Sequence, residues 1–133
     1  MEPKKKILII EDDTFTRDVY VEALTDAGFD VKPAADGQVG LELARAGGFD
    51  LVLLDMMLPK VDGLGILRGL KNEPPTKPNG PIILLTNLSH DPILKMAEDL
   101  GVSQHIIKSD IDPGQLVEKV REFLQKGTNG LSV

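Results

Sequence analysis

Five short apolar segments recur along the chain, and segments with the helical spacing of apolar residues separate them. The apolar segments, each of the length of a strand, cover residues 6–10, 29–35, 49–55, 82–86 and 102–108. The intervening segments predict helices over residues 14–28, 36–48, 62–73, 91–100 and 112–126. Such alternation requires right-handed crossovers, which make the sheet parallel and place helices on both of its faces. We predict a doubly wound α/β domain with five helices and five parallel strands in the order 2-1-3-4-5.

The length and composition are those of one soluble domain. The chain has 133 residues, of which 41% are hydrophobic and 27% charged, and no apolar run approaches the length that spans a bilayer. Its first apolar run, Ile7–Ile10, is too short for the apolar region of a signal peptide. We therefore predict a cytoplasmic protein, with residues 1–127 forming the domain and residues 128–133 a disordered tail or the stub of a linker.

The amino-acid usage also narrows the function. The chain has no cysteine, so it has no disulfide framework, no thiolate nucleophile and no thiolate metal site. Its formal net charge is −6, and its basic residues are scattered apart from Lys4–Lys6. Phosphate backbones are bound by clustered lysine and arginine, so nucleic acid is not expected as a direct partner.

Charged and hydroxyl side chains end the predicted strands. In chain order they are Glu11, Asp12, Asp13, Asp55, Thr86 and Lys108. In a doubly wound sheet the functional site lies beyond the carboxyl ends of the strands, where the strand order reverses between the first and third strands. The sequence therefore predicts that these side chains converge at one edge of the sheet.

Asp55 requires a partner or a role, because it ends the most apolar strand and an isolated buried carboxylate is costly. An all-oxygen acidic cluster suits a hard divalent cation such as Mg²⁺. A static phosphate site instead needs a glycine- or hydroxyl-rich loop after the first strand, and here that loop is acidic. The pattern favours Asp55 as a nucleophile toward phosphorus, with Mg²⁺ and Lys108 neutralising the phosphoryl charge.

Four motifs together resemble one family. "ILIIEDD", "LVLLDMMLPKVDG", "IILLTN" and "HIIKSD", in this order and spacing, resemble the receiver domain of two-component response regulators, over about residues 5–126. The resemblance implies a flavodoxin-like receiver fold and a cytoplasmic signalling domain rather than an enzyme, one that catalyses only its own phosphorylation and dephosphorylation. It implies that Asp55 accepts a phosphoryl group from a sensor histidine kinase, a phosphotransfer protein or a small phosphodonor.

The same resemblance implies roles for the neighbouring residues. Mg²⁺ is expected on Asp12, Asp55 and the backbone carbonyl of Met57, with Glu11 acting through water. Lys108 is expected to contact the phosphoryl oxygens and Thr86 to bond to them after phosphorylation, which lets His105 turn inward. The surface coupled to this switch, residues 91–126, is where partners are expected to bind. Asp13 is instead expected to cap the following helix.

This sequence departs from the family pattern at three positions. His105 stands where an aromatic residue is usual. Ser109 stands where a proline after a cis bond is usual, so the Lys108–Ser109 peptide is either trans or held cis by its surroundings. Asn87 replaces a small residue and narrows access to Asp55, which bears on the rate of phosphotransfer. Met57 and Leu88 flank the expected site and cannot activate water, which predicts a long-lived aspartyl phosphate.

Three alternatives stay open on the sequence alone. One is a docking module with this fold that is never phosphorylated. The second is a phosphatase or phosphotransferase with an aspartate nucleophile, although such enzymes usually carry a second aspartate where Met57 stands. The third is a flavodoxin-like cofactor carrier, which the acidic first loop disfavours. The sequence also leaves open the cognate kinase and whether two copies associate through the helices at residues 91–100 and 112–126.

Overall fold

A computed structural model of the chain describes residues 3–87 and 91–131, with side chains described over residues 3–87 and 92–126. Its strands form one parallel sheet in the order β2-β1-β3-β4-β5, which confirms the predicted topology. The strands are β1 (Lys6–Ile10), β2 (Asp30–Ala34), β3 (Leu51–Asp55), β4 (Ile82–Thr86) and β5 (Val102–Ile107). The helices are α1 (Thr14–Asp26), α2 (Gly37–Ala46), α3 (Gly63–Asn72), α4 (Asp91–Asp99) and α5 (Pro113–Leu131), with a short 3₁₀ turn, η1 (Lys108–Asp110), after β5.

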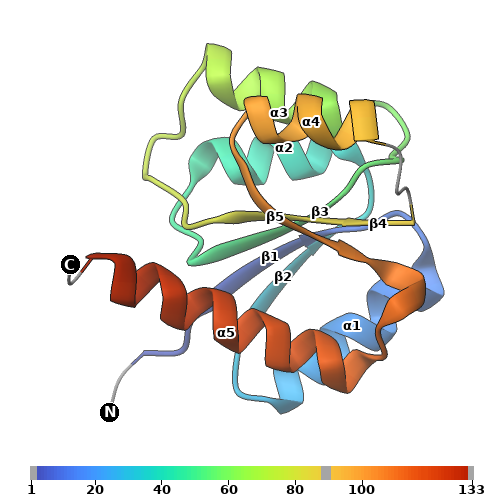
Figure 1. Cartoon of the computed structure of the whole chain (residues 1–133), viewed down its shortest axis with the longest axis vertical. Coiled ribbons are helices and arrows are strands. Elements are labelled where there is room, and N and C mark those ends of the chain that lie inside the picture. The colour runs from blue at the N-terminus through green and yellow to red at the C-terminus, as the bar shows by residue number, and fades with distance from the viewer. Residues whose placement is uncertain (1–2, 88–90, 132–133) are drawn as a thin grey trace.

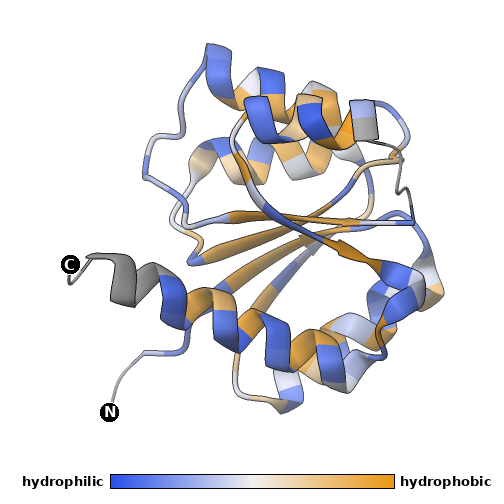
Figure 2. Ribbon diagram, viewed as in Figure 1, coloured by the Kyte–Doolittle hydropathy of each residue, from blue (hydrophilic) through white to orange (hydrophobic). Residues whose placement is uncertain are grey.

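Helices cover both faces of the sheet. Figure 1 shows α2, α3 and α4 on one face and α1 and α5 on the other. Side chains alternate along each strand, so Leu8 and Leu54 pack under the first layer while Ile9 and Leu53 pack under the second. All five residues of β3 are buried, as its uninterrupted apolar pattern predicts for a central strand. Figure 2 shows the same arrangement as hydrophobic strands between helices whose apolar sides face inward.

Aspartates fix the starts of the helices that follow the strands. Asp13, Asp36 and Asp62 precede α1, α2 and α3, and each accepts a hydrogen bond from the backbone N–H three residues on, at 2.8, 2.9 and 2.8 Å. Asp13 is therefore a helix cap, as predicted. Each cap satisfies a backbone donor that the helix leaves unpaired, and it begins the helix close to the carboxyl edge of the sheet.

On α4, Leu94 and Ala97 are buried and Ile93 and Leu100 pack against the core, whereas Met96 is 41% exposed. One helix boundary differs from the prediction. We expected the last helix to end at residue 126, and α5 continues to Leu131. The described residues contain no cis peptide bond, so the Lys108–Ser109 peptide is trans.

Hydrogen bonds anchor the loop between α3 and β4 to the rest of the domain. Asn79 accepts a hydrogen bond from the backbone N–H of Phe49 at 3.1 Å and donates one to the carbonyl of Ala44 at 2.8 Å. Lys77 forms a parallel bridge with Gly47. This segment therefore closes the amino-terminal edge of the sheet. Within the described residues, no helix combines the length and apolar character needed to cross a membrane.

Candidate functional site

Asp55 lies at the carboxyl end of β3, and its side chain is held from two sides. It is 4% exposed. Its Oδ1 accepts a hydrogen bond from the backbone N–H of Met57 at 3.2 Å, and its Oδ2 lies 3.1 Å from the Nζ of Lys108. The carboxylate therefore sits at the end of the central strand with both oxygens engaged, at the edge of the sheet where α1 begins and η1 lies (Figure 1).

Glu11 and Lys108 form the closest ion pair of this region. Lys108 Nζ lies 2.6 Å from Glu11 Oε1, while Glu11 Oε2 accepts a hydrogen bond from the backbone N–H of Asp13 at 3.2 Å. Burial raises the pKa of Glu11, the hydrogen bond from Lys108 opposes this rise, and the neighbouring Asp55 adds to it. Burial alone would lower the pKa of Lys108, but Glu11 and Asp55 together raise it above its ordinary value. Lys108 is therefore held as a cation between two carboxylates.

Asp12 completes an acidic cluster with the chemistry of a divalent-cation site. Glu11, Asp12 and Asp55 each offer a carboxylate oxygen, and these oxygens lie within 4.8 Å of one another. Asp12 is exposed, whereas Glu11 and Asp55 are buried. Lys108 pairs with two of the three carboxylates, so the cluster holds excess negative charge that a hard cation would offset. The oxygen-only donor set suits Mg²⁺ and does not suit a soft metal.

Arg17 is a residue of this region that sequence reasoning missed. Its Nη1 donates hydrogen bonds to the backbone carbonyls of Glu11 and Asp12, at 2.9 and 3.2 Å. The Arg17 side chain thereby holds the backbone of Glu11 and Asp12 in place. The sequence does carry a signal, because Arg17 lies one helical turn after the cap Asp13, within reach of the chain that precedes the helix.

The remaining predicted residues lie at the carboxyl edge, except His105, which lies within β5, and they differ in exposure. Thr86 ends β4 and is 1% exposed. Asn87, the next residue, is exposed. His105 is an exposed residue of β5 that pairs in register with Leu84. Met57 is 67% exposed beside Asp55, whereas Met56 is buried in the core. Leu88, which we expected to flank the site, lies outside the described residues.

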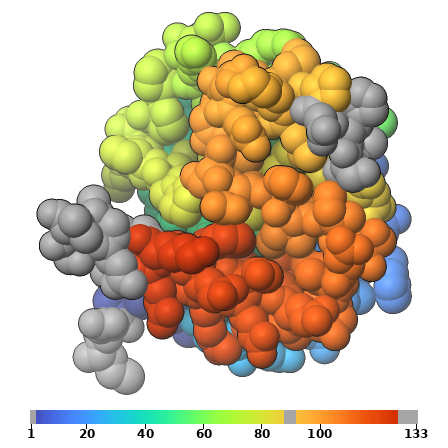
Figure 3. Space-filling view, in the orientation of Figure 1, coloured from blue at the N-terminus to red at the C-terminus, as the bar shows by residue number. Residues whose placement is uncertain are grey.

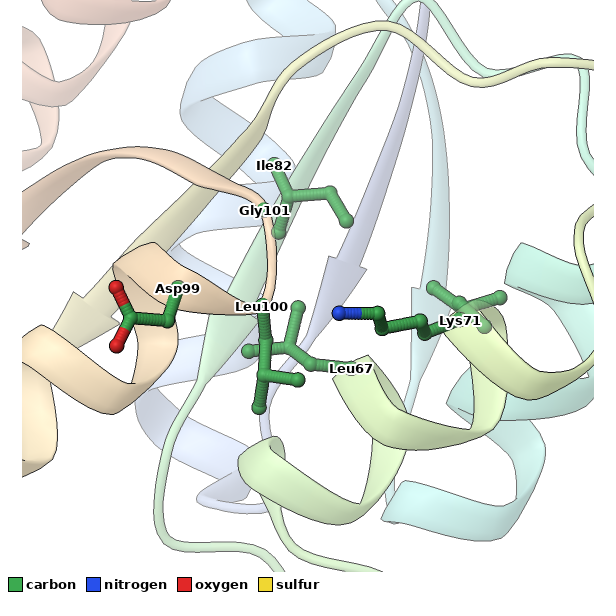
Figure 4. Close-up of a pocket in the computed structure, with 7 residues that line it drawn as sticks. Leu67, Lys71, Ile82, Asp99, Leu100 and Gly101 are labelled. Carbon is green, nitrogen blue, oxygen red and sulfur yellow. The ribbon is translucent and has the colours of Figure 1, made fainter.

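A separate hollow lies at the opposite edge of the sheet. Ile82, at the start of β4, and Gly101, just before β5, line it together with residues of α3 and the end of α4. Figure 4 shows Leu67, Leu100 and Ile82 around this space, with the Lys71 side chain extending toward it. Among the described residues that line it, the charged ones are Lys71 and Asp99, and the acidic cluster lies at the carboxyl edge instead.

Comparison with known proteins assigns the family. Residues 7–121 match the response regulator receiver domain family. The chain is 36% identical to the transcriptional regulatory protein CusR of Escherichia coli strain K12 over 122 residues, which are 92% of this chain and 52% of CusR. It is 35% identical to the probable transcriptional regulator ycf27 of Porphyridium aerugineum over 123 residues, covering 92% of this chain and 49% of that protein.

A solved structure agrees with this assignment. The CheY-like response regulator receiver domain protein of Methanospirillum hungatei JF-1 superposes with a TM-score of 0.84 at 28% identity, covering 96% of this chain and 99% of that one. The chain belongs to the receiver domains of response regulators, the family that the sequence motifs indicate. It spans about half the length of the curated relatives described above.

Proposed function

We propose that this receiver domain is a phosphorylation-dependent switch in which Asp55 is the phosphoryl acceptor. One observation carries the proposal: the Asp55 carboxylate belongs to an acidic cluster at the carboxyl edge of the sheet and pairs there with the Lys108 ammonium. Lys108 would neutralise a phosphoryl oxygen on Asp55. Asp12, Asp55 and the Met57 carbonyl would hold Mg²⁺, with Glu11 acting through water.

The chemistry is a transfer between two nucleophiles. An Asp55 oxygen attacks the phosphorus of a phosphohistidine, the nitrogen–phosphorus bond breaks, and the imidazole of the donor leaves as the aspartyl phosphate forms. Bound Mg²⁺ would offset the charge of the phosphoryl oxygens. The Asp55 oxygen that carries the new group releases its present contact with the protein. Lys108 then exchanges part of its pairing with the carboxylates for a bond to the phosphoryl group.

Thr86 and His105 would couple this event to the surface. Thr86 is buried at the end of β4, the strand that pairs with β3, and its hydroxyl would respond to a charge added at Asp55. A movement of Thr86 would let His105 turn inward from its exposed position on β5. Asn87 follows Thr86 at the rim and would restrict access to the site.

The surface formed by α4, β5 and α5, which carries His105 and lies next to Thr86, is the proposed partner-binding face. Figure 3 shows α4, β5 and α5 forming one continuous face of the molecule. Met96 is an exposed apolar side chain of α4, and Gln104 and His105 are exposed on β5. A sensor histidine kinase or phosphotransfer protein would supply the phosphoryl group in the cytoplasm. A downstream protein or effector domain would bind this face, and no nucleic acid need contact the domain itself.

The deciding experiment is intact-protein mass spectrometry after incubation with acetyl phosphate and Mg²⁺. The wild-type chain is expected to gain one phosphoryl group, and Asp55→Asn to gain none. Asp99→Asn is the matched control, because Asp99 is an exposed aspartate at the other edge of the sheet and its variant should gain the group normally. A folded wild-type protein that binds Mg²⁺ and stays unmodified would contradict the proposal and favour a docking module that is never phosphorylated.

A further inference from the structure

The loop between β3 and α3 carries the proposed metal ligand Met57, and it is closed at its base. The backbone N–H of Gly63 donates to the carbonyl of Met56 at 2.9 Å. A methyl group on Gly63 would lie 2.9 Å from the Cα of Met56 and 3.0 Å from the carbonyl oxygen of Asp55. The chain therefore returns to within contact of the site after eight residues, and the path of the loop determines where the Met57 carbonyl lies.

The tip of this loop is a tight turn in a conformation that side chains disfavour. The backbone N–H of Val61 donates to the carbonyl of Pro59 at 2.8 Å, and Lys60 between them has a φ of 69°. This is a γ-turn with a left-handed central residue, a rare and strained form. Among the described residues, Lys60 is the one non-glycine residue with a positive φ. Such a conformation persists only where the surroundings hold it.

The first residues of α2 supply those surroundings. Gly37 donates its backbone N–H to the Pro59 carbonyl at 3.2 Å. A Cβ atom on Gly37 would lie 1.5 Å from the carbonyl oxygen of Val61, so α2 and the loop meet backbone to backbone. The Nζ of Lys60 also lies 3.4 Å from Asp36 Oδ2. That ion pair is largely exposed on the lysine side and stabilises little by itself, so the backbone contact is the stronger constraint.

We propose that Lys60 and Gly37 are positioning residues for the acidic site, because their contact holds the loop that presents Met57 beside Asp55. Neither residue touches the carboxylate cluster, and both act through the path of the backbone. The inference rests on the proposed function, since it concerns the affinity of the same site for Mg²⁺. It predicts that changes at the tip of the loop alter metal binding without altering any ligand.

Two substitutions of Lys60 separate the backbone effect from the ion pair. Lys60→Gly and Lys60→Val both remove the contact with Asp36, but glycine adopts a positive φ freely and valine resists it. Calorimetric titration with Mg²⁺ is expected to show Lys60→Gly within about twofold of wild type and Lys60→Val about tenfold weaker. Melting without Mg²⁺ is measured in parallel, and each titration is run well below the melting temperature so that folded protein is compared.

Gly37→Ala tests the other side of the contact without changing Lys60. The added methyl group must displace the Val61 carbonyl, so the Mg²⁺ affinity is expected to fall by about tenfold or more. Equal affinities for Lys60→Gly and Lys60→Val, or an unchanged affinity in Gly37→Ala, would overturn the inference while leaving the proposed function intact. A wild-type chain that neither binds Mg²⁺ nor gains a phosphoryl group would contradict both.

Discussion

The two edges of the sheet satisfy their polar groups in opposite ways. At the amino edge a neutral amide, Asn79, bonds the backbone of Phe49 and Ala44, and the Asp50 carboxylate accepts the N–H of Lys6 at 2.7 Å. At the carboxyl edge three carboxylates cluster, and the Lys108 ammonium pairs with two of them, Glu11 and Asp55. These polar groups of the amino edge therefore pair with other groups of the protein. The carboxyl edge instead holds excess negative charge that an external cation can offset. This excess negative charge distinguishes the carboxyl edge, which carries the candidate site, from the amino edge.

Among the substitutions considered, the removal of Lys108 from the carboxyl edge is expected to have the largest effect on stability. Lys108→Met leaves Glu11 and Asp55 buried without their cation, so the metal-free protein should lose about 3 kcal/mol of unfolding free energy. Mg²⁺ should restore part of this loss, because it replaces the missing positive charge. Urea unfolding with and without Mg²⁺ measures both quantities. A loss that Mg²⁺ does not reduce would contradict the proposed position of the ion.

The removal of Asp12 should abolish the dependence of stability on the metal. For a site that binds the folded state alone, Mg²⁺ at a hundred times its Kd stabilises by about 2.7 kcal/mol, and Asp12→Asn should remove most of this gain. Without Mg²⁺ the variant should be at least as stable as wild type, since one of three clustered charges is gone. Melting curves across a Mg²⁺ titration test both statements, and an unchanged Mg²⁺ response in the variant would count against the site.

The amino edge should respond to mutation without any dependence on Mg²⁺. Asn79→Ala leaves the Phe49 N–H and the Ala44 carbonyl without their partner, which should cost about 2 kcal/mol. The cost should be the same with and without Mg²⁺, because the substitution lies at the far end of the sheet. Urea unfolding of Asn79→Ala under the conditions used for Lys108→Met makes the comparison direct. A Mg²⁺-dependent cost here would show that the two edges are coupled.

The smallest expected effect is a pH dependence that originates at Glu11. Its pKa is raised by burial above the ordinary value of 4.5, so between that value and the folded-state pKa the folded protein binds more protons than the unfolded one. In that window the metal-free protein should gain stability as the pH falls. The lowered pKa values of Asp13 and Asp36, each held down by hydrogen bonds to its carboxylate, act in the opposite direction but only at lower pH.

Glu11→Gln tests this assignment. The variant cannot titrate at this position, so the gain in stability on mild acidification should shrink. Thermal unfolding of wild type and variant is measured without Mg²⁺ over a pH series. The series runs from neutral pH down to about the ordinary pKa of a glutamate in the unfolded chain. Identical pH profiles would show that another group is responsible.

Most of the fold follows from local patterns. The continuous apolar run of β3 predicts a strand buried on both faces, and Pro33 fits the edge strand β2 in which it lies. The stripe of Leu116, Val117 and Val120 is buried on α5 as its spacing predicts. The exposure of Met96 and the burial of Leu94 on α4 are by contrast set by contacts with neighbouring elements, which the sequence does not reveal.

The sequence by itself determined the strand order and the residues that meet at the carboxyl edge, because the ends of parallel strands lie on one side whatever their side chains do. Only the tertiary structure decided how those residues pair. Glu11 and Lys108 are 97 positions apart, yet they form the shortest ion pair in the described part of the chain. The support from Arg17 and the left-handed turn at Lys60 likewise depend on contacts between elements, and local sequence preferences do not fix such contacts.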